Sequence, residues 1–217
     1  MNYYCLESKN PSKSVEKFIY GNTYHNYMVL KLTHKILRLL IESKDKDFSI
    51  REVSKLLKID YKNIYSAVQS IKDSIDMTKR SNSCFIKFKP KLSNDIYFVE
   101  KYRGEEVLKN QEINLIVKDL SSLKNPFFVA VLFGSYAKKT ANKNSDIDLC
   151  IIHDNADSFK KIHSSLSIHP KIELHEFTFD EFIQLLKSKD FNVGHEIVKD
   201  GIILKNIEIY YGLIKYE

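Results

Sequence analysis

Apolar side chains recur every three or four positions between residues 31 and 75, which is the spacing of one face of an α-helix. We predict three short helices there, with the inward-facing positions Leu32, Ile36, Leu39 and Leu40, then Ile50, Val53, Leu56 and Leu57, and finally Ile64, Val68, Ile71 and Ile75. Ser49 and Glu52 have the spacing of a capping box, in which each side chain bonds the other residue's backbone N–H. The second helix should therefore begin at Ile50.

The pattern changes after the third helix. A basic, polar turn at 79–83 is flanked by a predicted strand, Cys84–Lys89, and by another around Ile96–Val99. A helix from about Arg103 to Leu123 is then expected to connect the first part of the chain to the second. Residues 1–30 are polar and tyrosine-rich with little periodicity, and we expect them to form an N-terminal arm of unknown role.

Strand and helix patterns alternate in the second half of the chain. Short runs rich in β-branched and aromatic residues predict strands at 127–133, 146–152 and 171–177. Helices are predicted from Ser135, over 156–166, and beginning near Asp180, Val193 and Ile207. Because this alternation is typical of a small mixed sheet backed by helices, the predicted fold class is α+β.

The composition is that of a globular protein with a sizeable core, since 43% of the 217 residues are apolar and 29% are charged. No apolar run reaches transmembrane length, and no signal peptide is evident. Cys5, Cys84 and Cys150 are too scattered for a disulfide framework or a zinc site. These features lead us to expect a protein of the reducing cytoplasm.

Positive charge is concentrated in the first half of the chain. Residues 1–110 contain 21 Lys and Arg against 13 Asp and Glu, a net charge of +8, whereas residues 111–217 contain 13 against 15, a net charge of −2. A basic half is the electrostatic footprint expected of a nucleic-acid-binding module. General lysine richness is the alternative explanation, but it does not account for the asymmetry.

Two motifs in the second half suggest phosphate chemistry. Gly134 and Ser135 follow an apolar strand, and a glycine–serine turn lets backbone N–H groups approach phosphate oxygens. Asp146 and Asp148 lie on the next predicted strand, where alternate residues share one face. Neighbouring carboxylates repel each other unless a cation lies between them, and Mg²⁺ binds one or two carboxylates together with phosphate oxygens. The two motifs together indicate metal-dependent phosphate chemistry.

The full pattern from Gly134 to Leu149 is Gly-Ser-x-Ala-Lys-Lys-x5-Ser-Asp-Ile-Asp-Leu. It resembles the signature of the DNA polymerase β-like nucleotidyltransferase superfamily, particularly its minimal nucleotidyltransferases. The resemblance implies a nucleotidyltransferase fold, a nucleoside triphosphate substrate, and Mg²⁺ or Mn²⁺ as cofactor. It also implies nucleotide-binding residues at Gly134, Ser135, Lys138 and Ser145, and metal-binding catalytic carboxylates at Asp146, Asp148 and Glu173.

The third carboxylate has two candidates in the sequence, and the basic pair departs from the superfamily pattern. The superfamily takes its third carboxylate from a later strand, here 171–177, where Glu173 is the first choice and Glu176, on the opposite face, is the alternate. His175 on the same strand could line the site or have a structural role. Lys138-Lys139 replaces the usual Arg-Gly, which keeps the positive charge but loses the bidentate fork of arginine.

Three helices followed by a β-hairpin with a basic tip resemble the winged helix-turn-helix of DNA-binding regulators. The two resemblances together divide the chain into a winged helix-turn-helix at 31–102, a connecting helix at 103–125 and a nucleotidyltransferase domain at 126–217. They imply that the third helix is the recognition helix, that double-stranded DNA is a partner, and that the assembly is a homodimer. The implied DNA-contacting residues are Tyr61, Lys62, Asn63, Ser66, Gln69 and Ser70 on the helix, and Lys79, Arg80, Lys87 and Lys89 on the wing. Winged helices also serve as protein–protein modules, so that alternative stays open.

These features predict an enzyme that transfers a nucleoside monophosphate, AMP from ATP, onto a hydroxyl of a macromolecular acceptor and that also binds DNA. Minimal nucleotidyltransferases often act beside HEPN-domain toxins, so the resemblance makes a HEPN-type protein a candidate partner and a protein hydroxyl, such as that of tyrosine, a candidate acceptor. Three alternatives remain: a DNA-binding regulator that senses nucleotide without turnover, a small-molecule transferase, and an enzyme that modifies RNA ends.

Overall fold

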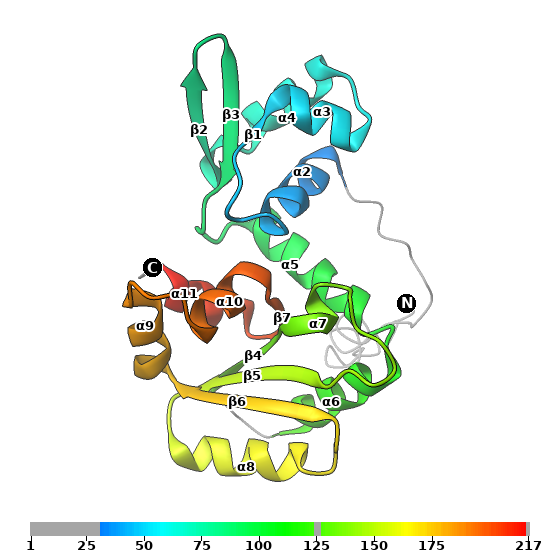
Figure 1. Cartoon of the computed structure of the whole chain (residues 1–217), viewed down its shortest axis with the longest axis vertical. Helices are drawn as coiled ribbons and strands as arrows, with labels where there is room; N and C mark the ends of the chain where they lie inside the picture. Colours follow the sequence, from blue (N-terminus) through cyan, green and yellow to red (C-terminus); the bar gives the residue numbers. More distant parts are fainter. Residues whose placement is uncertain (1–30, 124–126, 216–217) are drawn as a thin grey trace, which may run out of the picture.

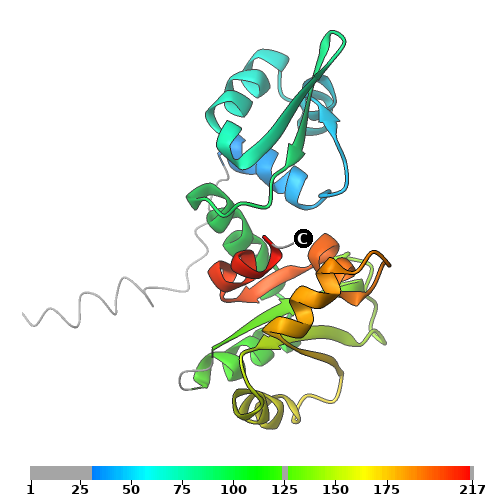
Figure 2. The ribbon, with the colours of Figure 1, turned by 90° about the vertical axis from the view of Figure 1, so that its left-hand side faces the viewer.

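A computed structural model describes residues 31–123 and 127–215, so the predicted arm at 1–30 lies outside the described residues. Figures 1 and 2 show a group of short helices with a β-hairpin at one end of the molecule and a mixed sheet at the other, with a long helix running between them. No helix within the described ranges has the length and apolar character needed to span a membrane.

The three predicted helices at the N-terminal end are present. They are α2 (Leu32–Ile41), α3 (Ile50–Leu57) and α4 (Tyr61–Ser70). The capping box is confirmed, because Ser49 Oγ accepts a hydrogen bond from Glu52 N and Glu52 Oε2 accepts one from Ser49 N. Two of the predicted inward positions are wrong. Leu56 is 56% exposed, whereas Val53 on the same helix is fully buried, and Ile75 is buried but begins a strand and does not belong to the third helix.

A three-stranded antiparallel sheet follows the helices. Its strands, in spatial order, are β1 (Phe48–Ser49), β3 (Ser83–Phe88) and β2 (Ile75–Arg80). The predicted strand at Cys84–Lys89 is therefore confirmed, but its hairpin partner is β2 and not the stretch at Ile96–Val99. That stretch lies in helix α5 (Asn94–Val107), whose N-terminus is capped by Ser93 accepting from Ile96 N. Ile96 and Val99 are both buried, and a spacing of three suits a helix face.

The expected single helix from Arg103 to Leu123 is wrong. Helix α5 ends at Val107, and a separate helix, α6, covers Gln111–Ser122. The side chain of Asn110 begins α6 by accepting hydrogen bonds from Glu112 N at 2.9 Å and Ile113 N at 3.2 Å. Asparagine is a favoured N-cap residue, so this break has a local cause that the apolar pattern alone did not reveal.

The second sheet is mixed and has the spatial order β6-β5-β4-β7. Its strands are β4 (Phe128–Leu132), β5 (Ile147–His153), β6 (Ile172–Thr178) and β7 (Ile202–Lys205). The first three match the predicted strands, whereas β7 was not predicted. Strand β4 pairs antiparallel with both β5 and β7, and β5 pairs in parallel with β6.

Helices cover both faces of this sheet, as Figure 1 shows. They are α6 and α8 (Ala156–Leu166) on one face, and α9 (Phe179–Lys187), α10 (Val193–Asp200) and α11 (Ile207–Ile214) with α5 on the other. The alternation of a strand separates the cores: Val129 and Val131 belong to the α9–α11 side, whereas Ala130 belongs to the α6–α8 side. The core on the α9–α11 side continues without interruption into the three N-terminal helices.

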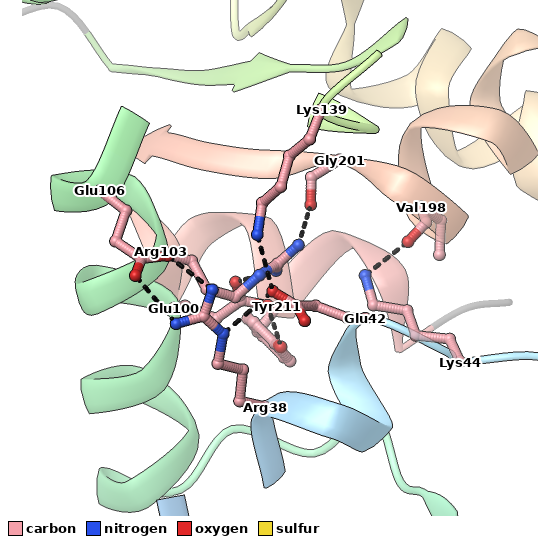
Figure 3. A network of polar contacts seen from close by, with 10 residues as sticks. All are labelled: Arg38, Glu42, Lys44, Glu100, Arg103, Glu106, Lys139, Val198, Gly201 and Tyr211. Carbon is pink, nitrogen blue, oxygen red and sulfur yellow. Dashed lines mark hydrogen bonds and ion pairs between the residues drawn. The ribbon is translucent and has the colours of Figure 1, made fainter. Parts of the chain in front are cut away.

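A polar network also joins the two ends of the molecule (Figure 3). We call Glu100, Arg103 and Tyr211 the buried triad. Glu100 accepts hydrogen bonds from Arg103 Nη1 at 2.5 Å and from the Tyr211 hydroxyl at 2.8 Å, and Arg103 Nη2 donates to the Gly201 carbonyl at 3.2 Å. Arg38 of α2 donates through two nitrogens to Glu106 of α5. These polar contacts therefore link helix α5 to α2, to α11 and to the start of β7.

Candidate active site

Gly134 lies directly against the carboxylate of Asp148. The chain leaves β4, passes Phe133 and turns at Gly134, whose φ of 63° lies in the left-handed region that favours glycine. A Cβ atom at this position would lie 1.9 Å from Asp148 Oδ2. The four-residue helix α7 (Gly134–Ala137) begins there, and the Ser135 backbone N–H bonds the Asp148 carboxylate. Only glycine fits this turn, because any side chain would occupy the carboxylate's position.

Strand β6 brings two further polar side chains to Asp148. In the parallel register Asp148 lies opposite Glu173, and Cys150 lies opposite His175. One potential ligand atom from each of Asp148, Glu173 and His175 lies within 4.8 Å of the others. His175 Nε2 is 3.4 Å from Glu173 Oε1, and its ring packs edge-on against Phe133. We call Asp148, Glu173 and His175 the carboxylate cluster.

The carboxylate cluster concentrates negative charge. Partial burial raises the pKa of Asp148 above its ordinary value, and the neighbouring Glu173 carboxylate raises it further, while the Ser135 N–H and His175 act in the opposite direction. Two oxygen donors and one imidazole nitrogen form a donor set that suits a divalent cation, which would offset the repulsion between the carboxylates. The two carboxylates therefore fit the Mg²⁺ that the sequence pattern implies, whereas an imidazole ligand is more typical of transition metals.

Asp146 has a different position from Asp148. It precedes β5, its side chain is exposed, and it is not part of the carboxylate cluster. The structure therefore brings together two of the three predicted carboxylates, Asp148 and Glu173. His175 completes the cluster, and its place two residues after Glu173, on the same side of a strand, is the sequence signal that could have assigned it to the site.

The alternate third carboxylate, Glu176, lies away from the cluster. Glu176 Oε1 lies at hydrogen-bonding distance, 2.8 Å, from His153 Nε2, on the other side of β6. Glu173 and Glu176 are three residues apart on one strand, so they face opposite sides of the sheet.

The other predicted nucleotide-binding residues have structural partners. Lys138 Nζ forms ion pairs with Glu196 at 2.7 Å and Asp200 at 3.4 Å, both on α10. The hydrogen bond to Glu196 raises the pKa of Lys138. Ser145 Oγ accepts from Asn142 N at 2.9 Å and so closes the turn that leads into β5. Lys138 and Ser145 therefore hold the loop between α7 and β5 in place.

The predicted DNA-contacting residues of the third helix are accessible to solvent. Tyr61, Lys62, Asn63, Ser66, Gln69 and Ser70 are all exposed on α4, whereas Ile64 and Val68 are buried. Asn63 also bonds the N-cap residue Asp60. In the hairpin, Arg80 pairs with Asp47 and stacks on the Phe85 ring. Lys79 is exposed near the hairpin tip, whereas Lys87 and Lys89 lie at its base.

Part of the chain is similar to a known protein family and to a solved structure. Residues 114–209 match the family model described as polymerase beta, nucleotidyltransferase. No curated protein matches the chain. Among solved structures, one described as the "crystal structure of the toxin-antitoxin with AMP-PNP" is similar, with 19% identity and a TM-score of 0.33 over 48% of this chain and 82% of that chain. The matched residues include Gly134, Asp148 and Glu173.

Proposed function

We propose that this protein is a Mg²⁺-dependent nucleotidyltransferase that moves a nucleoside monophosphate, AMP from ATP, onto a hydroxyl of a macromolecular acceptor, and that it also binds DNA. One observation carries the enzymatic part: the carboxylate cluster lies against the left-handed turn at Gly134, within the residues that match the nucleotidyltransferase family model. Neither a phosphate-binding turn nor an acidic pair is distinctive alone, but their direct contact gives one site both phosphate and metal chemistry.

Each residue has a distinct role in this proposal. Gly134 lets the backbone approach the triphosphate, and the Ser135 hydroxyl donates to its oxygens, while the Ser135 N–H stays on the Asp148 carboxylate. Asp148 and Glu173 hold the cation with His175 beside them, and Asp146, at the exposed start of the strand, contributes once nucleotide is bound. A bound divalent cation would supply positive charge to the phosphates and lower the pKa of the acceptor hydroxyl.

The transfer itself is a single displacement. The acceptor oxygen bonds to the α-phosphorus of ATP, the bond from that phosphorus to the bridging oxygen breaks, and pyrophosphate leaves. The hydroxyl proton needs a base, and we assign this role to Glu173, whose side chain is 59% exposed beside Asp148. Lys138 is held by Glu196 and Asp200, so its charge acts on the loop rather than directly on the nucleotide.

The DNA-binding part rests on the N-terminal elements. We propose that residues 31–102 act as a winged helix, with α4 entering the major groove and the β2–β3 hairpin as the wing. The exposed polar face of α4, the net charge of the first half and the open tip at Lys79 support this assignment. The boundaries at 103–125 and 126–217, the homodimer and a HEPN-type partner stay predictions.

The decisive experiment is incubation of purified protein with α-labelled ATP and Mg²⁺ in the presence of a cell extract, followed by separation of protein and RNA. We expect metal-dependent label on one acceptor class, and its loss in the Asp146→Asn/Asp148→Asn double variant. The control is Glu105→Gln/Glu208→Gln, which removes two exposed carboxylates on α5 and α11 and should retain activity.

A second candidate function is a DNA-binding regulator that senses nucleotide without turnover. The ion pairs of Lys138 favour it, because a lysine tied to two carboxylates contributes less positive charge to transition-state phosphates than a free one. ATP binding by calorimetry without any label transfer, together with ATP-dependent DNA affinity, would replace the enzymatic proposal by this one.

A further inference from the structure

A basic groove lies between the base of the β-hairpin and the helices α10 and α11, on the side of Figure 1 where the hairpin stands above both helices. Its volume is about 730 Å³, and six lysines but only two aspartates line it. We propose that this groove binds single-stranded nucleic acid, with its lysines on the phosphates and Phe191 stacking on a base. This site is separate from the exposed face of α4 and from the carboxylate cluster, and it takes Lys87 and Lys89, at the base of the hairpin, away from the duplex contacts that the winged-helix resemblance implied for them.

The first support is that three of the lysines in the groove are not neutralised by an ion pair within the described residues. Lys199 is paired with Asp45 at 2.9 Å, and Lys44 donates to the Val198 carbonyl, so these two hold the wall of the groove. Lys87, Lys89 and Lys91 take part in no ion pair within the described part of the chain. Asp76 lies opposite Lys87 in the hairpin register and also lines the groove. Three cations on one wall therefore remain available for an anionic ligand.

The second support is an aromatic platform on the opposite wall. Phe191 follows α9, and its side chain is 74% exposed, which is unusual for so large an apolar group. Its ring stacks on His195 of α10, with centroids 6.0 Å apart and an angle of 22° between the rings. His195 Nε2 lies 3.3 Å from the Leu186 carbonyl, so the imidazole holds the platform in place.

The combination selects the class of ligand. Phosphate alone would need only the lysines, and an acidic peptide would gain nothing from an exposed ring stacked on an imidazole. Single-stranded nucleic acid presents phosphates and unpaired base faces together, and a basic groove with aromatic side chains is the usual way in which proteins bind it. A duplex keeps its bases stacked inside, so Phe191 would have no base face to contact.

The test uses the full-length protein without ATP or metal, so that no transfer occurs. Fluorescence polarisation would measure binding of labelled oligouridylate and oligothymidylate of about 12 nucleotides, and of a duplex of equal length, because single-strand sites cover roughly 4 to 16 nucleotides. The groove variant is Lys87→Gln/Lys89→Gln/Lys91→Gln. The matched control is Lys109→Gln/Lys118→Gln/Lys161→Gln, which removes three exposed lysines elsewhere. Circular dichroism melting would confirm that both variants fold.

We expect single strands to bind the wild type, the groove variant to bind at least about tenfold more weakly, and the slope of log affinity against log salt to fall by about two for three lost phosphate contacts. Phe191→Ala should weaken binding at least fivefold without changing that slope, since base stacking on an aromatic ring is uncharged. Lys62→Gln/Lys79→Gln, on the proposed duplex-binding surface, should leave single-strand affinity unchanged.

Three results would overturn the groove assignment. Equal losses in the groove and control variants would mean that only overall charge matters. No effect of Phe191→Ala would remove the base-stacking role. Displacement of the oligonucleotide by polyglutamate of equal charge, at equal concentration, would show a general anion surface that fits an acidic protein instead. None of these results depends on nucleotidyl transfer, so the groove and the proposed enzymatic activity succeed or fail separately.

Discussion

The buried triad and the carboxylate cluster differ in how their negative charge is compensated. In the buried triad the Glu100 side chain is 0% exposed and receives donors from Arg103 and Tyr211, so a full negative charge is compensated inside the core. In the carboxylate cluster Asp148 and Glu173 lie beside each other with only His175 as a neighbouring base. The first arrangement is complete within the chain, whereas the second gains most from a cation that the chain does not contain.

The pKa directions express the same contrast. Burial alone would lower the pKa of Arg103, but the adjacent Glu100 carboxylate raises it, so the guanidinium stays charged. Burial and then Glu100 raise the pKa of the Tyr211 hydroxyl, which remains a neutral donor. For Asp148, burial and the like charge of Glu173 act together to disfavour the ionised form. The charge of Arg103 is thus favoured by a partner within the chain, whereas the neighbouring carboxylate of Asp148 disfavours its charge, as is common at binding sites.

Loss of Glu100 should have the largest effect on stability. Glu100→Ala would leave the Arg103 guanidinium buried without its partner, and breaking a buried pair in this way costs about 3–5 kcal/mol. We expect the free energy of unfolding, measured by urea denaturation, to fall by that amount. Glu105→Ala is the matched control, because Glu105 is an exposed glutamate on the same helix and its loss should change stability little. Equal effects of the two substitutions would refute the structural role of the triad.

Loss of Asp148 should instead reduce activity and leave the fold intact. Asp148→Asn removes a charge needed only when metal and nucleotide are bound, so we expect nucleotidyl transfer to fall by about 100-fold or more. In the absence of metal, the melting temperature should stay unchanged or rise, because the repulsion by Glu173 is gone. In addition, Mg²⁺ should raise the melting temperature of the wild type but not of the variant. A variant that loses stability and activity together would place Asp148 with the structural charges.

The two clusters also differ in how far the sequence predicts them. Gly134 and Asp148 come from short motifs that lie close together in the chain, because the turn follows β4 directly and β5 is the next strand. Glu173 is expected only from the resemblance, with Glu176 as the alternate, and its place beside Asp148 depends on the parallel pairing of β5 with β6. Glu100 and Arg103 read as ordinary charged positions of a helix surface. Their burial depends on Tyr211 and Gly201, about a hundred residues later in the chain, which local periodicity cannot show.

The errors in the predicted elements have the same origin. Strand β7 is only four residues long and is defined by its pairing with β4, which lies some 70 residues earlier. The assignment of Ile96–Val99 to a strand failed because a spacing of three fits a helix too, and the Ser93 cap decides in favour of the helix. Leu56 fits the apolar face of α3 by spacing alone, but no neighbouring element covers it.

A smaller stability change should follow removal of the Tyr211 hydroxyl. Tyr211→Phe keeps the ring in the core but deprives the Glu100 carboxylate of one of its donors, and a hydrogen bond to a charged group contributes about 1.5–3 kcal/mol. We expect a loss of that order in chemical denaturation, less than for Glu100→Ala. Tyr65→Phe, on the exposed face of α4, should change stability by less than about 0.5 kcal/mol. A larger effect of Tyr65→Phe would contradict the assignment of Tyr211 as a structural donor.

The pH dependence of stability should show the smallest effect and separates the two clusters most directly. Folding raises the pKa of Asp148, so its ionised form lowers stability above the ordinary value of 3.8, and the loss is complete once the pH exceeds the folded-state pKa. In EDTA at neutral pH, Asp148→Asn should therefore be slightly more stable than the wild type. This difference should shrink as the pH falls toward 3.8. Glu208→Gln, at an exposed position, should show no such convergence.

Because Mg²⁺ binds only the ionised carboxylate, its addition at neutral pH should reverse the order and make the wild type the more stable protein. If Mg²⁺ leaves Asp148→Asn more stable than the wild type, the carboxylate cluster binds no cation and its neighbouring carboxylates have another role.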